Sequence, residues 1–427
     1  MKNRLERDFL GIKEISEQAY YGIHTKRALE NFPISGLKNH RELIKAIAEI
    51  KLSVILLFRD LKKIDQKHSE AIITACKEIL NGKLLDEIVV DVFQAGAGTS
   101  LNMNINEVIA NRANEILGFP KGSYKPIHPN DTINIAQSTN DVIPAATRIA
   151  TIRMTNKLIQ KGKKLYKTFF KKGTEFKNFI KSGRTHLMDA TPITLGDEFQ
   201  AYGNALKKDC DYIKILLKPL YTVGIGGTAT GSGINAPKEY RENITSYLSK
   251  TTKLRLIQNP DLFEAMQNQA DLARLMGGVK TLTLNIIRIT NDLRLLSSGP
   301  NTGFNEIKLP EVQAGSSIMP GKINPSILEM TAMVCFFVLG MDTTVSMAVS
   351  AGQLELNVMM PIIANSMLWA LEYLTNAIEV LDKKCISGIK ANKEILKRYA
   401  QSSLALATIL SPYIGYERTA EDRKSVV

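Results

Sequence analysis

A regular stripe of apolar residues runs through residues 270–296 of the chain. Its members recur in alternating steps of three and four: Leu272, Leu275, Val279, Leu282, Ile286, Ile289, Leu293 and Leu296. This spacing places all of them on one face of a helix. The segment Ser297-Ser298-Gly299-Pro300 then ends the helix, because glycine and proline do not continue it. The pattern predicts a helical rod roughly 40 Å long at ~1.5 Å per residue.

Further apolar-rich stretches predict more helices, at residues 40–62, 69–80, 141–176 and 325–350. Long helices bury their apolar faces against one another, so the pattern indicates a mainly α protein built on a bundle of long helices. The regular stripe has two interpretations, since it can form the core of its own chain or pack against copies of the chain. We expect a mostly helical N-terminal domain at 1–139, a central helical-bundle domain at 140–394 and a short C-terminal segment at 395–427.

The composition is that of an ordinary soluble globular protein. Hydrophobic residues make up 44% of the 427 residues and charged residues 23%. The four cysteines lack paired spacing, so they suggest neither a disulfide framework nor a zinc site and fit a reducing cytoplasm. The N-terminus lacks the apolar core of a signal peptide, and the longest apolar run, 332–341, is too short to span a bilayer. We therefore expect a cytoplasmic protein with no membrane partner.

The chain is strongly basic, with a formal net charge of +13 and a pI near 9.3. Clustered lysines and arginines would suggest a nucleic-acid partner. Here the basic residues are dispersed along helical stretches such as 157–172, and no zinc-finger, helix-turn-helix or aromatic RNA-binding pattern accompanies them. We expect no nucleic-acid partner, and a positive field of this kind can instead draw small dianions toward a site.

The segment 315–325, GSSIMPGKINP, combines two serines, a lysine and an asparagine with glycines and prolines. Glycine gives the backbone freedom and proline restricts it, which favours a mobile flap with fixed ends. Lys322 and the N–H groups of the loop offer donors to a carboxylate or an oxyanion. The alternative is a surface turn that carries serines by chance, which the length and density of polar residue types disfavour.

Two further polar runs, 98–100 and 137–140, precede predicted helices. Their hydroxyl and amide side chains can cap the helix by accepting from its free N–H groups. Alternatively, the hydroxyls, the amide and the helix N-terminus together can bind a carboxylate. The residues alone leave the choice about even.

Together these motifs resemble the fumarase/aspartase superfamily. The resemblance runs from about residue 8 to about residue 415. The glycine between Pro320 and Lys322, Gly321, resembles the sequence pattern of the family's fumarase and ammonia-lyase branch. Its other motifs are YYGIHT at 20–25, GAGTS at 96–100, NMNINE at 102–107, QSTND at 137–141, GRTH at 183–186 and GQLELN at 352–357. The resemblance implies a three-domain lyase that assembles as a homotetramer with a twenty-helix core, and active sites that draw on three subunits. The segment after residue 416 differs from the family's C-terminal domain, so we expect a shortened C-terminal part.

The resemblance also implies roles for individual residues. Ser316 would act as general base, stabilised as an oxyanion by Lys322 and the loop N–H groups. His186 would pair with Glu329, which would keep the imidazole protonated and able to hold a carboxylate or move a proton. The residues implied to bind the substrate are Thr99, Ser138, Thr139, Asn140, Thr185, Ser317 and Asn324. This chemistry requires no metal or organic cofactor, and activation by a divalent cation is left open.

Two reactions compete within the family. One is the reversible loss of ammonia from L-aspartate to give fumarate, through an enolate-like intermediate, and the other is the reversible hydration of fumarate to L-malate. At three separated positions, Thr139, His24 and Gln353, the chain is similar to the ammonia-lyases. We therefore predict an enzyme, a carbon-nitrogen lyase acting on aspartate, with a fumarate hydratase as the alternative. A non-catalytic member retained for binding would be expected to lack Ser316, Lys322 or His186, and all three are present.

Overall fold

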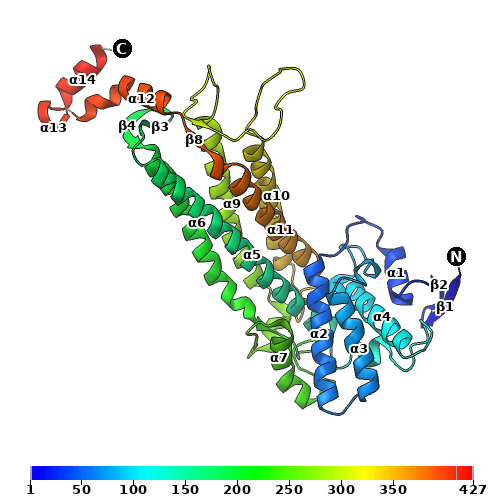
Figure 1. Cartoon of the computed structure of the whole chain (residues 1–427). Coiled ribbons are helices and arrows are strands. Elements are labelled where there is room, and N and C mark those ends of the chain that lie inside the picture. The colour runs from blue at the N-terminus through cyan, green and yellow to red at the C-terminus, as the bar shows by residue number, and fades with distance from the viewer. Residues whose placement is uncertain (1, 410, 426–427) are drawn as a thin grey trace. The chain divides into compact units, whose positions relative to one another are not determined.

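Helices dominate the structure, a computed structural model that describes residues 2–409 and 411–425 (Figure 1). The mainly α class predicted from the sequence is confirmed. Contacts between residues divide the chain into two compact units. Unit 1 comprises Met1–Asn156, Ile215–Gly277 and Gly340–Leu371, and unit 2 comprises Lys157–Lys214, Gly278–Leu339 and Glu372–Val427. Within the predicted C-terminal segment, residues 410 and 426–427 lie outside the described residues.

Unit 1 begins with an antiparallel hairpin and continues with four helices. Their bounds are β1 (Asn3–Asp8), β2 (Gly11–Ser16), α1 (Ile23–Asn31), α2 (Arg41–Asp60), α3 (Gln66–Leu80) and α4 (Thr99–Ile116). The side chains of His40 and Asp65 cap α2 and α3 by accepting from the N–H groups of Glu42 and His68. α2 packs against α3, and α3 against α4, as Figure 1 shows. Apolar residues on these helices, such as Ile47, Ile72 and Ile105, are completely buried.

The remaining elements of unit 1 lie later in the chain. They are β5 (Thr222–Val223), α7 (Lys238–Thr252), β6 (Ile257–Gln258) and α8 (Leu262–Gln267), with β5 and β6 parallel and α7 packed on α2. Short 3₁₀ or π turns join the elements of both units: η1 (Leu85–Glu87), η2 (Gly96–Gly98), η3 (Pro129–Ile133), η4 (Lys218–Tyr221), η5 (Ile386–Gly388) and η6 (Leu404–Ile409).

Long helices contribute residues to both units. They are α5 (Thr139–Glu175), α6 (Leu195–Leu217), α9 (Ala270–Leu296), α10 (Ser326–Ser350) and α11 (Met360–Lys384). The helices predicted at 40–62, 69–80, 141–176 and 325–350 correspond to α2, α3, α5 and α10, with ends that differ by at most three residues. The helix predicted at 270–296 coincides with α9. Apolar periodicity and the Gly-Pro terminator therefore located these helices correctly.

The apolar stripe of α9 faces the chain's own core. All eight of its members are at most 5% exposed within the single chain. The interpretation that this stripe packs against copies of the chain is therefore wrong. A side chain already enclosed by its own chain has no surface left to bury against a second copy.

In unit 2 the long helices pack through aromatic rings and polar bridges. The rings of Phe176 and Phe199 meet edge to face at 5.2 Å, which joins α5 to α6. Tyr202 of α6 donates to Asp292 of α9 at 3.1 Å, and Lys161 of α5 pairs with Glu379 of α11 at 2.7 Å. The other elements of this unit are β3 (Ile180–Thr185), β4 (Met188–Thr194), β7 (Ile307–Lys308), β8 (Lys390–Ala391), α12 (Lys393–Ser402), α13 (Ser411–Ile414) and α14 (Tyr416–Ser425).

One face of α10 is exposed and carries no charged residue. It consists of Met333, Phe336, Phe337, Gly340, Thr343, Ser346, Met347 and Ser350. α10 is also the only helix of the described residues with the length and apolar composition of a membrane span, and 33% of its most apolar window is buried inside the chain. The uninterrupted apolar run 332–341 covers only part of this helix, which is why the run alone did not indicate a span. A single such helix also occurs in the core of soluble proteins, so it is weak evidence for a membrane.

Candidate active site

The first candidate residue, Thr99, begins α4 in unit 1. The residue before it, Gly98, has a φ of 89°, and a Cβ there would lie 3.1 Å from Ile143 Cγ1. Only glycine fits this approach without strain. Gly98 has no side chain to cap α4, and Gln94 Oε1 accepts from the N–H of Leu101 in the first turn at 2.7 Å. A helix N-terminus of this kind favours an anion. The half-buried Thr99 hydroxyl stands at this helix end.

Ser138 caps α5, and capping is one of the two roles that the sequence left open for the 137–140 run. Its Oγ accepts from the N–H of Asn140 at 3.2 Å, and its own N–H donates to Asp141 Oδ1 at 3.0 Å. This reciprocal arrangement is a capping box, with aspartate in the acidic position. Because Ser138 Oγ accepts here, its hydroxyl proton can still be donated to a ligand. Capping and carboxylate binding are therefore compatible at this residue.

The two residues after Ser138 have different partners. Thr139 Oγ1 accepts from Asn102 Nδ2 at 3.1 Å, and Asn140 Nδ2 donates to the carbonyl of Ala229 at 2.8 Å. Each of these contacts leaves one polar hydrogen, on the Thr139 hydroxyl and on the Asn140 amide, for another acceptor. Thr99, Ser138, Thr139 and Asn140 all belong to unit 1.

Asp141 holds the start of α5 in place through its buried carboxylate. It is completely buried and accepts from the N–H groups of Gly226 and Thr228, both at 3.1 Å. Burial raises the pKa of Asp141 to about 7, against the opposing effect of these N–H donors and that of Ser138. Asp141 belongs to the QSTND motif at 137–141, and the motif alone indicates no role for it. Its value as an anchor depends on the loop at 226–228, which lies far away in the sequence.

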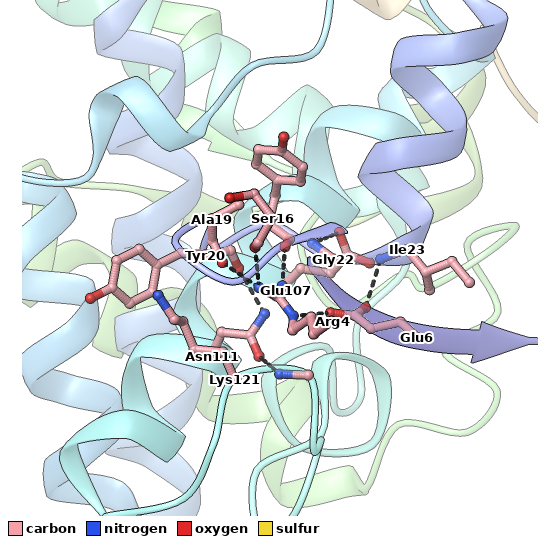
Figure 2. A network of polar contacts seen from close by, with 12 residues as sticks. Arg4, Glu6, Ser16, Ala19, Tyr20, Gly22, Ile23, Glu107, Asn111 and Lys121 are labelled. Atoms are coloured by element: carbon pink, nitrogen blue, oxygen red, sulfur yellow. Dashed lines mark hydrogen bonds and ion pairs between the residues drawn. The ribbon is translucent and has the colours of Figure 1, made fainter. Parts of the chain in front are cut away.

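Another polar network holds the YYGIHT segment at 20–25 (Figure 2). Glu107 of α4 accepts from the N–H groups of Gly22, His24 and Thr25 and from the Thr25 hydroxyl, at 2.6 to 3.1 Å. Glu6 of β1 accepts from the N–H of Ile23 at 2.8 Å. Burial raises the pKa of Glu107 to about 7. The two carboxylates fix the backbone of a segment that carries one of the three positions favouring an ammonia-lyase.

In unit 2 the loop at 315–325 is closed at its base by hydrogen bonds. The N–H of Gly315 donates to the carbonyl of Lys322 at 2.7 Å, and Asn324 Nδ2 donates to the carbonyl of Gly315 at 2.5 Å. A Cβ at Gly315 would lie 2.6 Å from both Asn324 N and Lys322 O, so this position requires glycine. The ends of the loop are thus fixed, as predicted, and one amide hydrogen of Asn324 is used to fix them.

Ser316, the predicted base, lies half-buried within this loop. Its Oγ accepts from the N–H groups of Ile318 at 3.2 Å and Met319 at 2.9 Å. Two backbone donors directed at one oxygen stabilise negative charge on it, which a serine requires to act as a base at neutral pH. Sequence reasoning predicted loop N–H groups in this role but did not identify which ones. Ser317 and Lys322 are exposed beside it.

Thr185 and His186 lie at the exposed tip of the β3–β4 hairpin. His186 and Leu187 form the two-residue turn with φ values of 56° and 61°. Residues other than glycine, asparagine, aspartate and histidine rarely adopt this left-handed conformation, so the strain falls mainly on Leu187, and such strain is concentrated at functional sites. Strand β3 of the hairpin is held by Arg184 and Lys181, which pair with the buried Glu306, both at 2.7 Å. The imidazole is therefore presented by a rigid support.

Glu329, the predicted partner of His186, lies near Arg294, with 4.0 Å between Oε1 and Nη2. In the described part of the chain no hydrogen bond or ion pair joins Glu329 to His186. A single chain therefore does not bring this predicted pair together. Thr185, His186, Ser316, Ser317, Lys322, Asn324 and Glu329 all belong to unit 2.

A cavity of about 910 Å³ lies in unit 2 beside the 315–325 loop. Its lining includes the cations Arg294, Lys308 and Lys322, together with Glu311 and Asn324. Three cations against one carboxylate favour an anionic ligand. The cavity borders residues predicted for catalysis and also residues, such as Arg294 and Lys308, that the sequence analysis did not single out. No local sequence signal marks these two cations, because basic residues are frequent throughout the chain.

Comparison with known proteins agrees with this architecture. A family model described as Lyase matches residues 11–340. Aspartate ammonia-lyase from Escherichia coli (strain K12) is 45% identical over 416 residues, which cover 97% of this chain and 87% of that protein. Aspartate ammonia-lyase from a Bacillus species is 44% identical over 418 residues, which cover 98% and 89%. The crystal structure of class II fumarase from Schistosoma mansoni superposes with a TM-score of 0.96 at 35% identity, covering 99% of this chain and 92% of that one.

The chain therefore belongs to this lyase family, the fumarase/aspartase superfamily. Within it, the chain resembles aspartate ammonia-lyases at 44 to 45% identity and the fumarase at 35%. The family membership predicted from the sequence motifs is confirmed.

Proposed function

We propose that this chain is an aspartate ammonia-lyase, which converts L-aspartate reversibly to fumarate and ammonia. The observation that carries the proposal is the near full-length identity of 44 to 45% with two aspartate ammonia-lyases, at least nine percentage points above the class II fumarase. Thr139, His24 and Gln353 support the same choice. The fold suits either reaction, since the fumarase shares it, and class II fumarate hydratase is the alternative function.

The chemistry begins at Ser316. As an alkoxide held by the N–H groups of Ile318 and Met319, its Oγ takes a proton from the carbon next to one carboxylate of aspartate. The electron pair of the broken C–H bond moves into that carboxylate and gives an enolate-like intermediate. The pair then returns to form the carbon-carbon double bond while the C–N bond breaks, and nitrogen leaves as ammonia with the electron pair of that bond.

The other residues hold the substrate during these steps. The outward hydroxyls of Thr99, Ser138 and Thr139 and the N-termini of α4 and α5 bind carboxylate oxygens. Lys322 and Ser317 bind on the side of the 315–325 loop, together with Thr185 of the hairpin and the remaining amide hydrogen of Asn324. His186, paired with Glu329, holds a carboxylate or moves a proton. Negative charge builds up on the carboxylate as the intermediate forms. These donors therefore accelerate the reaction to the extent that they bind the intermediate more tightly than they bind aspartate.

The functional assignment is tested by following fumarate absorbance from L-aspartate and, separately, from L-malate. We expect aspartate to be converted and malate to be a poor substrate, with the difference in kcat/KM because the two substrates share both carboxylates. Conversion of malate much faster than aspartate would establish the fumarase alternative.

The assignment of the base is tested with a pair of neighbouring serines. Ser316→Ala should lower kcat by about 100-fold or more, because it removes the group that takes the proton. Ser317→Ala, in the same loop, should act mainly on KM. Near wild-type turnover of Ser316→Ala, with an intact oligomer, would show that another group is the base.

We also propose that the enzyme is a homotetramer with a twenty-helix core, and that each active site combines residues of three subunits. The uncharged exposed face of α10 supports this, since large apolar side chains such as Phe336, 59% exposed, are typically covered in an assembly. A second subunit would also have to supply the carboxylate for His186, since Glu329 does not meet it within the described part of one chain. Mixing the weakly active Thr139→Val and Ser316→Ala subunits, followed by dissociation and reassociation, should restore part of the activity. Recovery of none, in tetramers shown to contain both variants, would contradict shared sites.

The division into domains at 1–139, 140–394 and 395–427 stays a proposal, and α5 begins at Thr139, at the first boundary. A cytoplasmic location, and the absence of membrane and nucleic-acid partners, are likewise proposed. They fit an enzyme that acts on a small dicarboxylate.

A further inference from the structure

A buried polar cluster lies behind the start of α5. It consists of Lys51 on α2, Asn102 and Asn106 on α4, and Asn134 in the segment before α5, and we refer to it as the Lys51 cluster. Lys51 Nζ, Asn102 Nδ2 and Asn106 Nδ2 all donate to Asn134 Oδ1, at 2.9, 3.1 and 3.3 Å. Lys51, Asn102 and Asn106 are at most 1% exposed. The three donors converge on one oxygen and hold it in place.

The cluster is expensive for an apolar core to hold. The Oδ1 atoms of Asn102 and Asn106 are buried without a hydrogen-bond partner among the described residues, and each such atom costs roughly 1–3 kcal/mol. Burial lowers the pKa of Lys51 to about 7, so the ammonium form is also disfavoured there. Buried polar groups of this kind, which lower stability, are concentrated at sites where function requires them.

Asn102 and Asn106 differ in the second acceptor of their amide groups. The Nδ2 of Asn102 also donates to Thr139 Oγ1, at 3.1 Å, whereas the Nδ2 of Asn106 donates to Met103 Sδ, at 3.5 Å. An oxygen that accepts at one position directs its own hydrogen elsewhere. The described part of the chain offers no acceptor for the Thr139 hydroxyl hydrogen, so this hydrogen is available to a ligand.

We propose that Asn102 is a positioning residue, which turns the Thr139 hydroxyl so that its hydrogen is donated to a substrate carboxylate, with Asn134 and Lys51 holding Asn102 in place. The proposal rests on the proposed function insofar as Thr139 binds the substrate. It adds to that function a residue that is buried and makes no contact with the substrate. The cost of the buried cluster is offset by a hydroxyl that needs no reorientation during the reaction.

Asparagine-to-aspartate substitutions give the sharpest test, because they keep size and replace the amide donor by a charged acceptor. In Asn102→Asp the carboxylate accepts from the Thr139 hydroxyl and turns its hydrogen inward, away from the substrate. The same carboxylate gains Lys51 as a charge partner, so the melting temperature should hold or rise while kcat/KM falls by about tenfold or more. Asn106→Asp adds the same charge to the same cluster without contacting Thr139, and should stay within about threefold of wild type.

The Thr139→Val background distinguishes orientation from general disruption. Once the hydroxyl is absent, adding Asn102→Asp should change the residual kcat/KM less than about twofold, because the two substitutions act on one interaction. Equal losses in Asn102→Asp and Asn106→Asp, or a full further loss on the Thr139→Val background, would overturn the proposal. Asn102→Ala and Asn106→Ala provide a second matched pair, in which stability should fall alike and activity should not.

Failure of the proposed function is distinguishable from failure of this inference. If the wild-type enzyme converts malate and not aspartate, the aspartase assignment fails. The same pairs measured with malate then still test Asn102, because both substrates present a carboxylate to Thr139. If Asn102→Asp is indistinguishable from Asn106→Asp with the substrate that the enzyme does convert, the positioning role is wrong.

Discussion

At the scale of single residues, the site depends on polar side chains buried inside unit 1. Glu107 is an example, because it accepts four hydrogen bonds from the 22–25 segment and is only 2% exposed (Figure 2). A carboxylate in such a position balances desolvation against hydrogen bonding. Its protonation should therefore be linked to folding.

The linkage has a definite sign. The pKa of Glu107 is raised from its ordinary value of 4.5 to about 7 in the folded state. The folded protein thus binds this proton more tightly than the unfolded chain, and the stabilisation present below about pH 4.5 is lost as the pH rises through about 7. Glu107→Gln lacks this titration. The free energy of unfolding of the wild type, relative to the variant, should fall by up to about 3 kcal/mol over that window.

Urea unfolding of both proteins at pH 5 and pH 8, at one protein concentration, measures this change. Other buried acids such as Asp141 titrate in both proteins and cancel in the difference. A difference between wild type and variant that is the same at both pH values would show that Glu107 does not titrate in this range.

At the scale of elements, the 315–325 loop has a base that hydrogen bonds fix and an exposed segment between its two ends. The base requires glycine at 315, whereas Gly321, with a φ of 79°, has no atom within 4 Å of an added Cβ. The two glycines therefore serve different purposes. One permits a close backbone approach, and the other only permits a left-handed conformation.

Gly315→Ala should displace the backbone of Asn324 and Lys322 and lower kcat/KM by about 100-fold, since small misplacements of catalytic groups are costly. Global stability should change by less than about 1 kcal/mol, because the loop is largely exposed. Gly321→Ala is the matched control and should lose about tenfold or less, because only local strain is introduced. Thermal melts and steady-state kinetics measure both effects. Equal kinetics for the two variants would contradict the role of the closed base.

At the scale of the whole molecule, assembly should depend on α10 and not on the apolar stripe of α9. The stripe is enclosed by its own chain, whereas Met333 and Phe336 on α10 are 65% and 59% exposed. Burying one large apolar side chain contributes roughly 1.5–3 kcal/mol, and symmetry repeats this in each subunit. The formal net charge of +13 opposes association, so the apolar contribution must exceed this repulsion.

Phe336→Glu should therefore shift the protein from tetramer to smaller species in size-exclusion chromatography with light scattering, and activity should fall with assembly. Phe9→Glu is the control, because Phe9 lies at the turn of the β1–β2 hairpin and is 95% exposed. It should change neither property. A Phe336→Glu protein that remains an active tetramer would exclude this face of α10 from the interface.

The sequence by itself determined the 315–325 loop, the family and five of the helices, namely α2, α3, α5, α9 and α10. Apolar periodicity fixed α9 from residue 270 to 296, and glycine and proline marked where helices end. These signals act between residues only a few positions apart, so they are readable without a fold. The motifs also identified the candidate residues one by one, because each motif is a short continuous segment.

Only the tertiary structure decided which residues support the candidate site residues. Asn102 reaches Thr139 across 37 positions of sequence, Lys51 reaches Asn134 across 83, and Glu107 reaches Gly22 across 85. Packing likewise enclosed the α9 stripe within its own chain and left the α10 face uncovered. A hydrogen bond over such a separation exists only after helices have packed, and no local pattern encodes which partner packing will supply.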